Sequence, residues 1–216
     1  ADRAEIAAHC LRGFDLDPTA ASLACWSLWE ACGARPPSLA TLESNIRCGD
    51  GLREGAAGSC DAVLGNPPWE TWQDERRERH AADAAPQRSA LAPQLRDGFV
   101  HQGRGKLYTY RLFVERAFQL LRPGGRLGMI VPASLWFDRD ALPLRRLLLD
   151  QCSWEWLFAF VNRRRLFAID RRYRFGAMVA TKGGRTDAVR VAFGAESADA
   201  WSAPTPDHHR YPRDAV

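Results

Sequence analysis

The sequence predicts an α/β protein with a mostly parallel, doubly wound sheet, and this prediction depends on three observations. Short predicted strands at residues 12–16, 44–48 and 61–64 are each followed closely by an Asp or Asn. Stretches with helical periodicity lie at residues 19–32 and 107–121. Strands that alternate with helices are typical of a parallel sheet, because each crossover helix returns the chain to the same edge.

The first predicted helices have recognisable start and stop signals. Residues 1–11 have helical composition but no evident cap. Asp17 is a favoured capping residue and Pro18 fits the first turn, so we expect a helix over residues 19–32. Gly33 ends this helix, and a loop that contains two prolines leads to the next strand.

The rest of the chain continues the alternation after one interruption. Residues 70–105 have mixed charge and no sustained period, so we interpret them as an insertion that is partly helical around residues 74–85. The clearest apolar stripe belongs to the helix at residues 107–121. The remaining predicted elements lie at residues 126–132, 142–150, 154–161, 174–181 and 189–193. The strands on either side of residue 170 have no helix between them, so one should run antiparallel.

Length and composition limit the class of protein. The 216 residues suffice for one domain, and 46% apolar with 26% charged residues is ordinary for a globular protein. The formal net charge of +4 permits a polyanionic partner without requiring one. The six cysteines form no CxxC pair and no histidine stands at ligand spacing, so no metal is expected. Without a long apolar run or a signal pattern, we expect a cytoplasmic protein with no membrane partner.

The tetrapeptide Asn66, Pro67, Pro68 and Trp69 is the most informative stretch. It follows an apolar run directly, and open α/β sheets bind ligands at the carboxyl ends of their strands. The prolines fix φ and remove two backbone donors, so nearby carbonyls stay outside any continuing helix. The result is a rigid cluster of acceptors beside an indole, which suits an amino group on a flat ring. The alternative is a strand-ending turn with a core tryptophan.

The order of motifs resembles the N6-adenine DNA methyltransferases of restriction–modification and phage-defence systems. Residues 66–69 resemble the catalytic tetrapeptide of this family. Further matches lie in the family's order at residues 13–18, 48–50, 121–132, 162–167 and 173–175. The resemblance covers residues 12–184. It implies a Rossmann-like class I methyltransferase fold, S-adenosylmethionine as cofactor, and double-stranded DNA as partner, with a fused or separate nuclease or specificity region.

The resemblance also implies how the tetrapeptide acts. An adenine N6 lone pair is delocalised into the ring and is a poor nucleophile. The Asn66 side-chain oxygen and the Pro67 carbonyl would each accept one N6 hydrogen, which draws the nitrogen toward tetrahedral geometry and directs its lone pair at a sulfonium methyl. Trp69 would stack on an adenine flipped out of the duplex, because the amine is otherwise paired and out of reach.

Four residues are assigned to the cofactor by the same resemblance. Asp15 would accept hydrogen bonds from the ribose hydroxyls, and Leu16 would pack on the cofactor's adenine. Asp50, with Gly51 beside it, would accept from the amino group of that adenine. The open alternatives are a helix cap for Asp15 and a simple Gly-Asp-Gly turn for Asp50.

Phe167 resembles the aromatic residue that closes the target-base pocket opposite Trp69, which would give a two-sided stack. On its own, a phenylalanine before a strand is as often a core residue. Arginines flank it and are candidates for contacts to phosphates beside the flipped nucleotide. These candidates are Arg163, Arg164, Arg165, Arg171 and Arg172. A charge run is usually a solvated face, so we expect two or three of them to touch DNA.

One departure concerns the glycine-rich turn that follows the family's first strand and wraps the methionine part of the cofactor. No Gly-x-Gly turn precedes Asp15. In the family's strand order the first strand lies between the Asp15 strand and the Asn66 strand, so we expect an excerpt of a longer protein without it. Residues 1–194 are expected to form the catalytic core, with the insertion at residues 70–105. Residues 195–216 are expected to be a linker or the start of a following region.

The expected function is transfer of a methyl group from S-adenosylmethionine to the N6 amine of a flipped-out adenine in DNA. The nearest alternative is a methyltransferase that uses the same tetrapeptide on protein glutamine or on RNA. Cytosine-N4 enzymes usually carry Ser in place of Asn66 and rank lower. An alternative from a different class is a non-catalytic DNA-binding or scaffolding piece without its cofactor turn.

Overall fold

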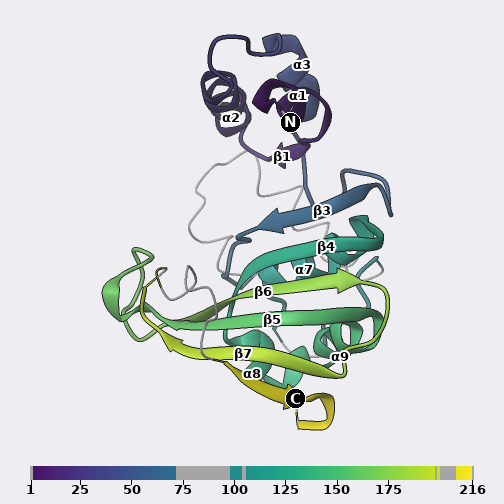
Figure 1. Ribbon diagram of the computed structural model, residues 1–216, viewed down its shortest axis with the longest axis vertical. Coiled ribbons are helices and arrows are strands. Elements are labelled where there is room, and N and C mark those ends of the chain that lie inside the picture. Colours follow the sequence, from purple (N-terminus) through teal and green to yellow (C-terminus); the bar gives the residue numbers. More distant parts are fainter. Residues whose placement is uncertain (1, 72–97, 104–105, 198, 200–207, 216) are drawn as a thin grey trace. The chain divides into compact units, whose positions relative to one another are not determined.

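The computed structural model comprises two compact units (Figure 1). Unit 1 spans residues 1–56 and unit 2 spans residues 57–216. The described residues are 2–71, 98–103, 106–197, 199 and 208–215. The helix predicted around residues 74–85 lies outside the described residues, and the single catalytic core over residues 1–194 stays a prediction.

Unit 1 combines two short strands with three helices. Its elements are α1 (Arg3–His9), β1 (Gly13–Asp15), α2 (Pro18–Ala31), α3 (Leu39–Asn45) and β2 (Ile46–Cys48). β1 and β2 pair in parallel, with Asp15 opposite Cys48. The helices meet around the buried side chains of Ala7, Cys25 and Leu42. Both predicted strands of this region are therefore present, joined by a helical crossover.

Side-chain caps set the helix starts of unit 1. Asp17 accepts a hydrogen bond from the Thr19 backbone N–H, as predicted for α2. Asp2 caps α1 by accepting from the Ala4 N–H, so the expectation of an uncapped first helix was wrong. α3 takes the place of the predicted loop, because Ser38 provides its cap directly after the two prolines.

Unit 2 is built on a six-stranded sheet with the order β3-β4-β6-β5-β7-β8. Its strands are β3 (Cys60–Gly65), β4 (Leu121–Pro132), β5 (Cys152–Val161), β6 (Arg174–Lys182), β7 (Ala188–Ala195) and β8 (His209–Pro212). Its helices are α7 (Thr109–Leu120), α8 (Ser134–Phe137) and α9 (Leu142–Gln151), and its 3-10 turns are η1 (Arg139–Ala141), η2 (Asn162–Arg164) and η4 (Arg213–Ala215). All strands predicted after residue 60 are present.

Four strands of this sheet, β3, β4, β5 and β7, share one direction, whereas β6 and β8 run the opposite way. β6 lies between β4 and β5 and pairs antiparallel with both, which confirms the predicted antiparallel strand. β8 lies within residues 195–216, where a linker or a following region was expected, and it pairs with β7. The sequence did not indicate β8, because four residues are too few to show a period.

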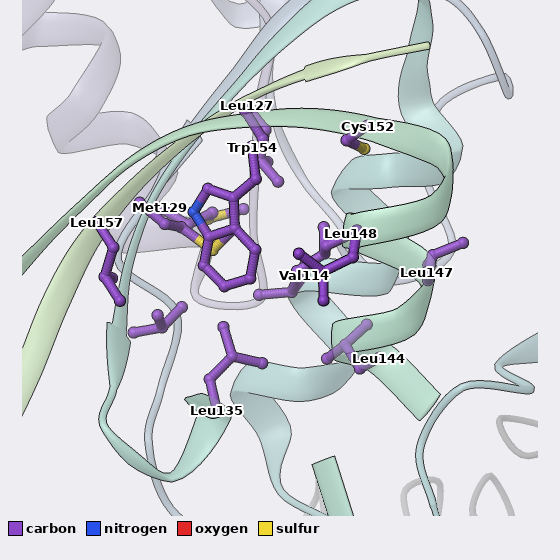
Figure 2. Close-up of a cluster of buried hydrophobic side chains, with 14 of the residues drawn as sticks. Val114, Leu127, Met129, Leu135, Leu144, Leu147, Leu148, Cys152, Trp154 and Leu157 are labelled. Atoms are coloured by element: carbon purple, nitrogen blue, oxygen red, sulfur yellow. The ribbon is translucent and has the colours of Figure 1, made fainter. Parts of the chain in front are cut away.

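The main core of unit 2 lies on one face of the sheet, where α7 and α9 pack (Figure 2). Trp154 of β5 lies among Met129 of β4, Leu148 of α9 and Val114 of α7. The apolar stripe predicted for residues 107–121 is therefore buried here. Each such side chain contributes about 1.5–3 kcal/mol when fully buried, so this layer stabilises the packing of α7 and α9 on the sheet.

A second cluster of buried side chains belongs to β5 and β6 and consists of Phe158, Phe160, Phe175 and Ala177. Side chains alternate along a strand, and the neighbouring Leu157 belongs to the main core, so this cluster lies on the opposite face of the sheet. Trp69 packs against both clusters. The indole of the tetrapeptide is thus held by apolar side chains from two layers.

The two sheets remain separate within the described residues. There, β1 pairs with β2 alone and β3 pairs with β4 alone. Leu64 of β3 is largely exposed. The expectation that the family's first strand is not part of the chain stays a prediction. No helix among the described residues has the length and apolar character needed to cross a bilayer.

Candidate active site

The tetrapeptide Asn66–Trp69 leaves the sheet at the carboxyl end of β3. Gly65, the last residue of β3, lies opposite Met129 of the parallel strand β4. The Asn66 side chain is exposed, whereas Pro67 is buried. Neither the Asn66 side chain nor the Pro67 carbonyl forms a hydrogen bond within the described part of the chain. Neither oxygen has a partner in that part of the chain, and the predicted role of both as hydrogen-bond acceptors for a ligand stays a prediction.

The residues after the tetrapeptide are fastened to the start of α7. Thr71 and Tyr108 form an isolated antiparallel bridge, and the Thr109 N–H donates to the Glu70 carbonyl over 3.1 Å. The Tyr108 ring in turn packs against the main core. These contacts fix the exit of the turn just as the β3–β4 pairing fixes its beginning, so the acceptors are presented from a rigid segment.

Three aromatic rings surround Trp69. The Tyr173 ring is stacked on the indole, with 5.6 Å between ring centroids and an angle of 13° between the planes. The Phe175 ring is tilted by 31° at 5.7 Å. The Phe167 ring meets the indole edge to face, at 5.6 Å and 73°. Trp69 and Phe167, two of the predicted residues, are thus brought together, and two further rings join them.

The geometry of Trp69 and Phe167 leaves no room for a base between them in this arrangement. A flat base between two parallel rings needs roughly 7 Å, which is twice the van der Waals separation of about 3.5 Å. The observed rings are closer than this and nearly perpendicular. The predicted two-sided stack would therefore require one of the aromatic side chains to move when a base binds.

The loop at residues 162–173 carries Phe167 and Tyr173 and is organised by Asn162. The Asn162 side chain is fully buried. Its Nδ2 donates to the carbonyls of Phe167, Ile169 and Asp170 over 3.0–3.2 Å, and its Oδ1 accepts from the Phe167 N–H over 3.0 Å. One side chain thus satisfies four backbone groups of the loop. Sequence reasoning gave Asn162 no role, although a polar residue directly after an apolar strand is a usable signal.

The arginines of this loop divide into paired and less constrained side chains. Arg163 and Arg164 share Glu196, at 3.2 Å and 3.8 Å. Arg172 pairs with Asp170 at 2.8 Å, and this pairing lowers the pKa of that carboxyl to about 2. The remaining candidates, Arg171 and Arg165, are exposed; Arg171 donates to a backbone carbonyl and Arg165 has a left-handed backbone, φ 54°. All five predicted arginines are solvent-accessible, and acidic partners hold three of them.

In unit 1, Asp15 and Leu16 lie at the carboxyl end of β1. One carboxylate oxygen of Asp15 accepts from the Asp17 N–H over 2.8 Å, and the other accepts no hydrogen bond among the described residues. Asp17, not Asp15, caps α2. Leu16 is 47% exposed, although it is apolar. Asp15 therefore retains an oxygen for a ligand, and Leu16 retains an apolar surface.

Asp50 and Gly51 lie beside Asp15, because the Gly49 N–H donates to the Asp15 carbonyl over 2.8 Å. The Asp50 side chain accepts from the Leu52 N–H over 3.0 Å, which is the simple turn that remained an alternative. Its second oxygen lies 3.7 Å from Arg53 and accepts no hydrogen bond among the described residues. The turn and a ligand-binding role are compatible, because one oxygen serves each.

Unit 2 contains a buried arginine that contacts aromatic side chains. Arg111 of α7 is fully buried and donates to the Asp138 carboxylate over 3.1 Å and to the Tyr110 hydroxyl over 3.1 Å. Its guanidinium lies 4.8 Å from the centre of the Tyr108 ring. Burial, followed by Tyr108 and Asp138, raises the pKa of the Tyr173 hydroxyl. Arg111 thus links Asp138 and the two tyrosines at the start of α7, a part that periodicity had assigned only to the core.

The predicted site residues therefore fall into two groups, one in each unit. Unit 1 brings together Asp15, Leu16, Asp50 and Gly51, whereas unit 2 brings together Asn66, Pro67, Pro68, Trp69 and Phe167. Outside the gaps at residues 72–97, 104–105 and 200–207, no group of three His, Cys, Asp or Glu residues is arranged to hold a metal ion. The prediction that no metal is bound stays a prediction.

Comparison with known sequences gives one family. Residues 9–167, more than half of the chain, match the sequence model of the Eco57I restriction-modification methylase family. A search of curated proteins finds no match.

Comparison with solved structures finds proteins whose fold is similar to that of this chain. A Listeria monocytogenes protein, assigned as a class I S-adenosylmethionine-dependent methyltransferase, aligns with a TM-score of 0.56 at 17% identity, over 87% of this chain and 50% of that one. The M protein of the type I restriction enzyme EcoKI aligns with a TM-score of 0.58 at 20% identity, over 84% and 34%. DrdV, solved in complex with DNA, aligns with a TM-score of 0.61 at 13% identity, over 95% and 24%. The chain spans half or less of each of these proteins and has their class I methyltransferase fold.

Proposed function

The chain belongs to the Eco57I restriction-modification methylase family, and we propose that it is the catalytic core of a DNA methyltransferase that acts on the N6 amine of adenine. One observation carries the proposal. Two oxygens, Asn66 Oδ1 and the Pro67 carbonyl, accept no hydrogen bond from the described residues and belong to the same turn as Trp69, which follows the carboxyl end of β3. An amino group with two hydrogens on a flat ring complements this arrangement.

The residues of the tetrapeptide have separate tasks in this reaction. The Asn66 and Pro67 oxygens each accept one N6 hydrogen, which localises the nitrogen lone pair for attack. Pro68 stiffens the turn, and Trp69 holds the base plane by stacking. The N6 nitrogen then forms its bond to the methyl carbon and loses one of its hydrogens to solvent as a proton. Because the turn is fixed by β3 and by α7, the acceptors are in place before substrate binds.

The residues of unit 1 fit S-adenosylmethionine. Asp15 and Asp50 each have one carboxylate oxygen that accepts no hydrogen bond from the residues that the structure describes, which suits the ribose hydroxyls and the adenine amine respectively. Leu16 offers an exposed apolar side chain to the cofactor's adenine, and Gly51 lies beside Asp50. When bound, the cofactor supplies a methyl group on a sulfonium sulfur, which keeps the electron pair of the broken bond.

The loop at residues 162–173, which contains the five candidate arginines, supports DNA as the substrate. An adenine paired in a duplex cannot reach Asn66 unless it is flipped out, and a flipped nucleotide needs its neighbouring phosphates held. Arg163, Arg164 and Arg171 are exposed in the loop that carries Phe167. Protein glutamine and RNA remain weaker proposals, because no described feature favours either substrate. Membership of this family further suggests a restriction-modification or phage-defence role for the whole protein.

The test is a map of N6-methyladenine in the DNA of cells that carry the full-length gene. Cells with Asn66→Ala serve as the comparison, and cells with Gln151→Ala serve as a matched control, because Gln151 is an exposed amide at the end of α9. We expect methylation at one short motif with the wild type and with Gln151→Ala. With Asn66→Ala the methylation should fall by at least about 100-fold, as when one transition-state contact is removed.

Two results would contradict the proposal. Identical maps from the wild type and Asn66→Ala, with both proteins expressed and folded, would remove the chemistry from this turn. A wild-type map without N6-methyladenine would remove adenine as the target. In that case the same purified proteins, incubated with tritiated S-adenosylmethionine and separate DNA, RNA and protein acceptors, would identify the substrate class.

A further inference from the structure

Tyr173 covers one face of the Trp69 indole, the ring on which the proposed function stacks a flipped base. Of the three rings around Trp69, only that of Tyr173 is nearly parallel to the indole, with 13° between the planes. An offset parallel stack is also the arrangement that a nucleobase adopts on an aromatic side chain. The Tyr173 ring therefore occupies the kind of position that the proposed function assigns to the target adenine.

Tyr173 is also the ring that can leave. Its side chain is 41% exposed, whereas Phe175 is 3% exposed and belongs to the second cluster of the sheet. Moving Phe175 would open that cluster, whereas Tyr173 belongs to neither cluster of unit 2, so its movement opens neither. Exposed side chains change rotamer in picoseconds to nanoseconds, so such a movement need not limit the reaction.

The backbone around Tyr173 does not need to change for this movement. Its N–H donates to the Asp170 carbonyl and its carbonyl accepts from the Asn162 N–H, over 3.1 Å and 3.0 Å. The Asn162 side chain holds the rest of the loop through Phe167, Ile169 and Asp170. The loop is thus a fixed frame, and rotation about the side-chain bonds of Tyr173 suffices to uncover the indole.

We propose that Tyr173 is a gate residue of the target-base site, which covers Trp69 in the DNA-free protein and is displaced when the flipped adenine stacks there. This inference rests on the proposed function and adds a residue that competes with the substrate. A protein whose site is open only part of the time binds its ligand with an affinity reduced by the open fraction. Tyr173 therefore weakens base binding, and its removal should strengthen it.

The experiment uses the full-length protein, tritiated S-adenosylmethionine, and genomic DNA from cells that lack the gene. Tyr173→Ala and Tyr173→Leu remove the aromatic ring, and the second keeps an apolar side chain of useful size if the first folds poorly. Tyr173→Phe keeps the ring, and Phe193→Ala is a control that removes an exposed ring from β7. Methyl transfer is measured against DNA concentration, and the melting temperature of each variant is recorded.

We expect the KM for DNA to fall by about threefold to tenfold for Tyr173→Ala and Tyr173→Leu, since an aromatic pair contributes that much to an equilibrium. Tyr173→Phe and Phe193→Ala should remain within about twofold of the wild type. An unchanged or higher KM for folded Tyr173→Ala and Tyr173→Leu would overturn the gate, because a packing residue or a wall of the base site can only lose binding. If the wild type transfers no methyl group to DNA, the proposed function fails and the gate fails with it.

Discussion

The turn at residues 66–69 and the turns at Asp15 and Asp50 are held in different ways. The first is fixed by tertiary packing, because Trp69 contacts two clusters of unit 2 and the following residues bridge to α7. The turns of unit 1 are held by local hydrogen bonds from backbone N–H groups two residues further on. The comparison teaches that the proposed catalytic turn is held by packing, whereas each carboxylate proposed for the cofactor is held through one oxygen by a local hydrogen bond.

This difference predicts which substitutions cost stability and which cost only binding. In unit 2, Asn162 is buried and satisfies backbone groups of the loop, so its loss should affect folding as well as function. In unit 1, Asp15 is exposed, so its loss should affect ligand affinity alone. The predictions that follow test this contrast, beginning with the largest effect.

Asn162→Ala should have the largest effect on stability. The substitution leaves one N–H and three carbonyls of the loop without their partner, and we expect the free energy of unfolding to fall by about 2–4 kcal/mol. Methyl transfer should fall with it, because Asn162 positions the backbone of Phe167. Urea unfolding measures the first quantity, and hydrogen exchange of residues 162–173 locates the change.

Asn45→Ala is the matched control for this substitution. Asn45 is a buried amide of unit 1 that donates to the carbonyls of Ala7 and Ala8 over 3.0 Å and 2.8 Å. Its loss should also lower stability, but hydrogen exchange of residues 162–173 should stay as in the wild type. Unchanged protection of the loop in Asn162→Ala would show that other contacts, not this side chain, hold the aromatic residues.

Asp15→Ala should affect binding without affecting stability. Hydrogen bonds to a charged group contribute about 1.5–3 kcal/mol, so we expect S-adenosylmethionine to bind roughly 10-fold to 150-fold more weakly. Titration calorimetry of the full-length protein measures this affinity, and the melting temperature should change little because Asp15 is exposed. Glu30→Ala, an exposed acidic residue of α2, is the control. Equal affinities in all three proteins would remove Asp15 from the cofactor site.

The sequence predicted those parts of the molecule that depend on local patterns. Asp17 indicated the start of α2, and the apolar stripe of residues 107–121 indicated α7. Elements with a weak period were missed, because α3 depends on its Ser38 cap and β8 on its pairing with β7. The main strands and their alternation with helices were therefore predictable, whereas short elements that tertiary contacts stabilise were not.

The same distinction applies to the candidate site. Motif order pointed to Asn66, Trp69 and Phe167, and the structure brings the last two together. The stacking of Tyr173 on Trp69 joins residues that are far apart in sequence, and its angle depends on how β6 and the loop pack. The hydrogen bonds of Asn162 depend equally on the path of the loop. Sequence motifs identify which residues belong to the candidate site. The orientation of their rings and the choice of hydrogen-bond partners depend on tertiary packing.

A smaller effect is expected when Arg163 and Arg164 lose the carboxylate that they share. Glu196→Gln releases Arg163 and Arg164 for phosphate contacts, and exposed pairs of this kind contribute about 0.2–1 kcal/mol. We expect duplex DNA to bind about twofold to fivefold more tightly at low salt, with a smaller difference at high salt. Fluorescence anisotropy at two salt concentrations measures this, and Glu43→Gln in α3 controls for the change in net charge. Equal salt dependence in Glu196→Gln and Glu43→Gln would exclude Arg163 and Arg164 from the DNA interface.

The smallest effect concerns Asp170 and Arg172, which meet on the surface of the same loop. Arg172 holds the pKa of the Asp170 carboxyl at about 2, below the ordinary value of 3.8. A lowered pKa in the folded state stabilises the protein above the ordinary value, and this contribution is lost as the pH falls from about 4 to about 2. Arg172→Ala should return the pKa toward 3.8, which a carbon-13 NMR titration of the Asp170 carboxyl detects.

Both side chains are exposed, so Arg172→Ala should leave the melting temperature at neutral pH nearly unchanged, in contrast to Asn162→Ala. A pKa that stays near 2 in Arg172→Ala would mean that the loop backbone, not the guanidinium, holds the charge of Asp170. Arg172 would then be free to bind phosphate without giving up a partner. If the pKa rises as expected, DNA must compete with Asp170 for this arginine, and Arg165 and Arg171 become the stronger candidates for the first phosphate contacts.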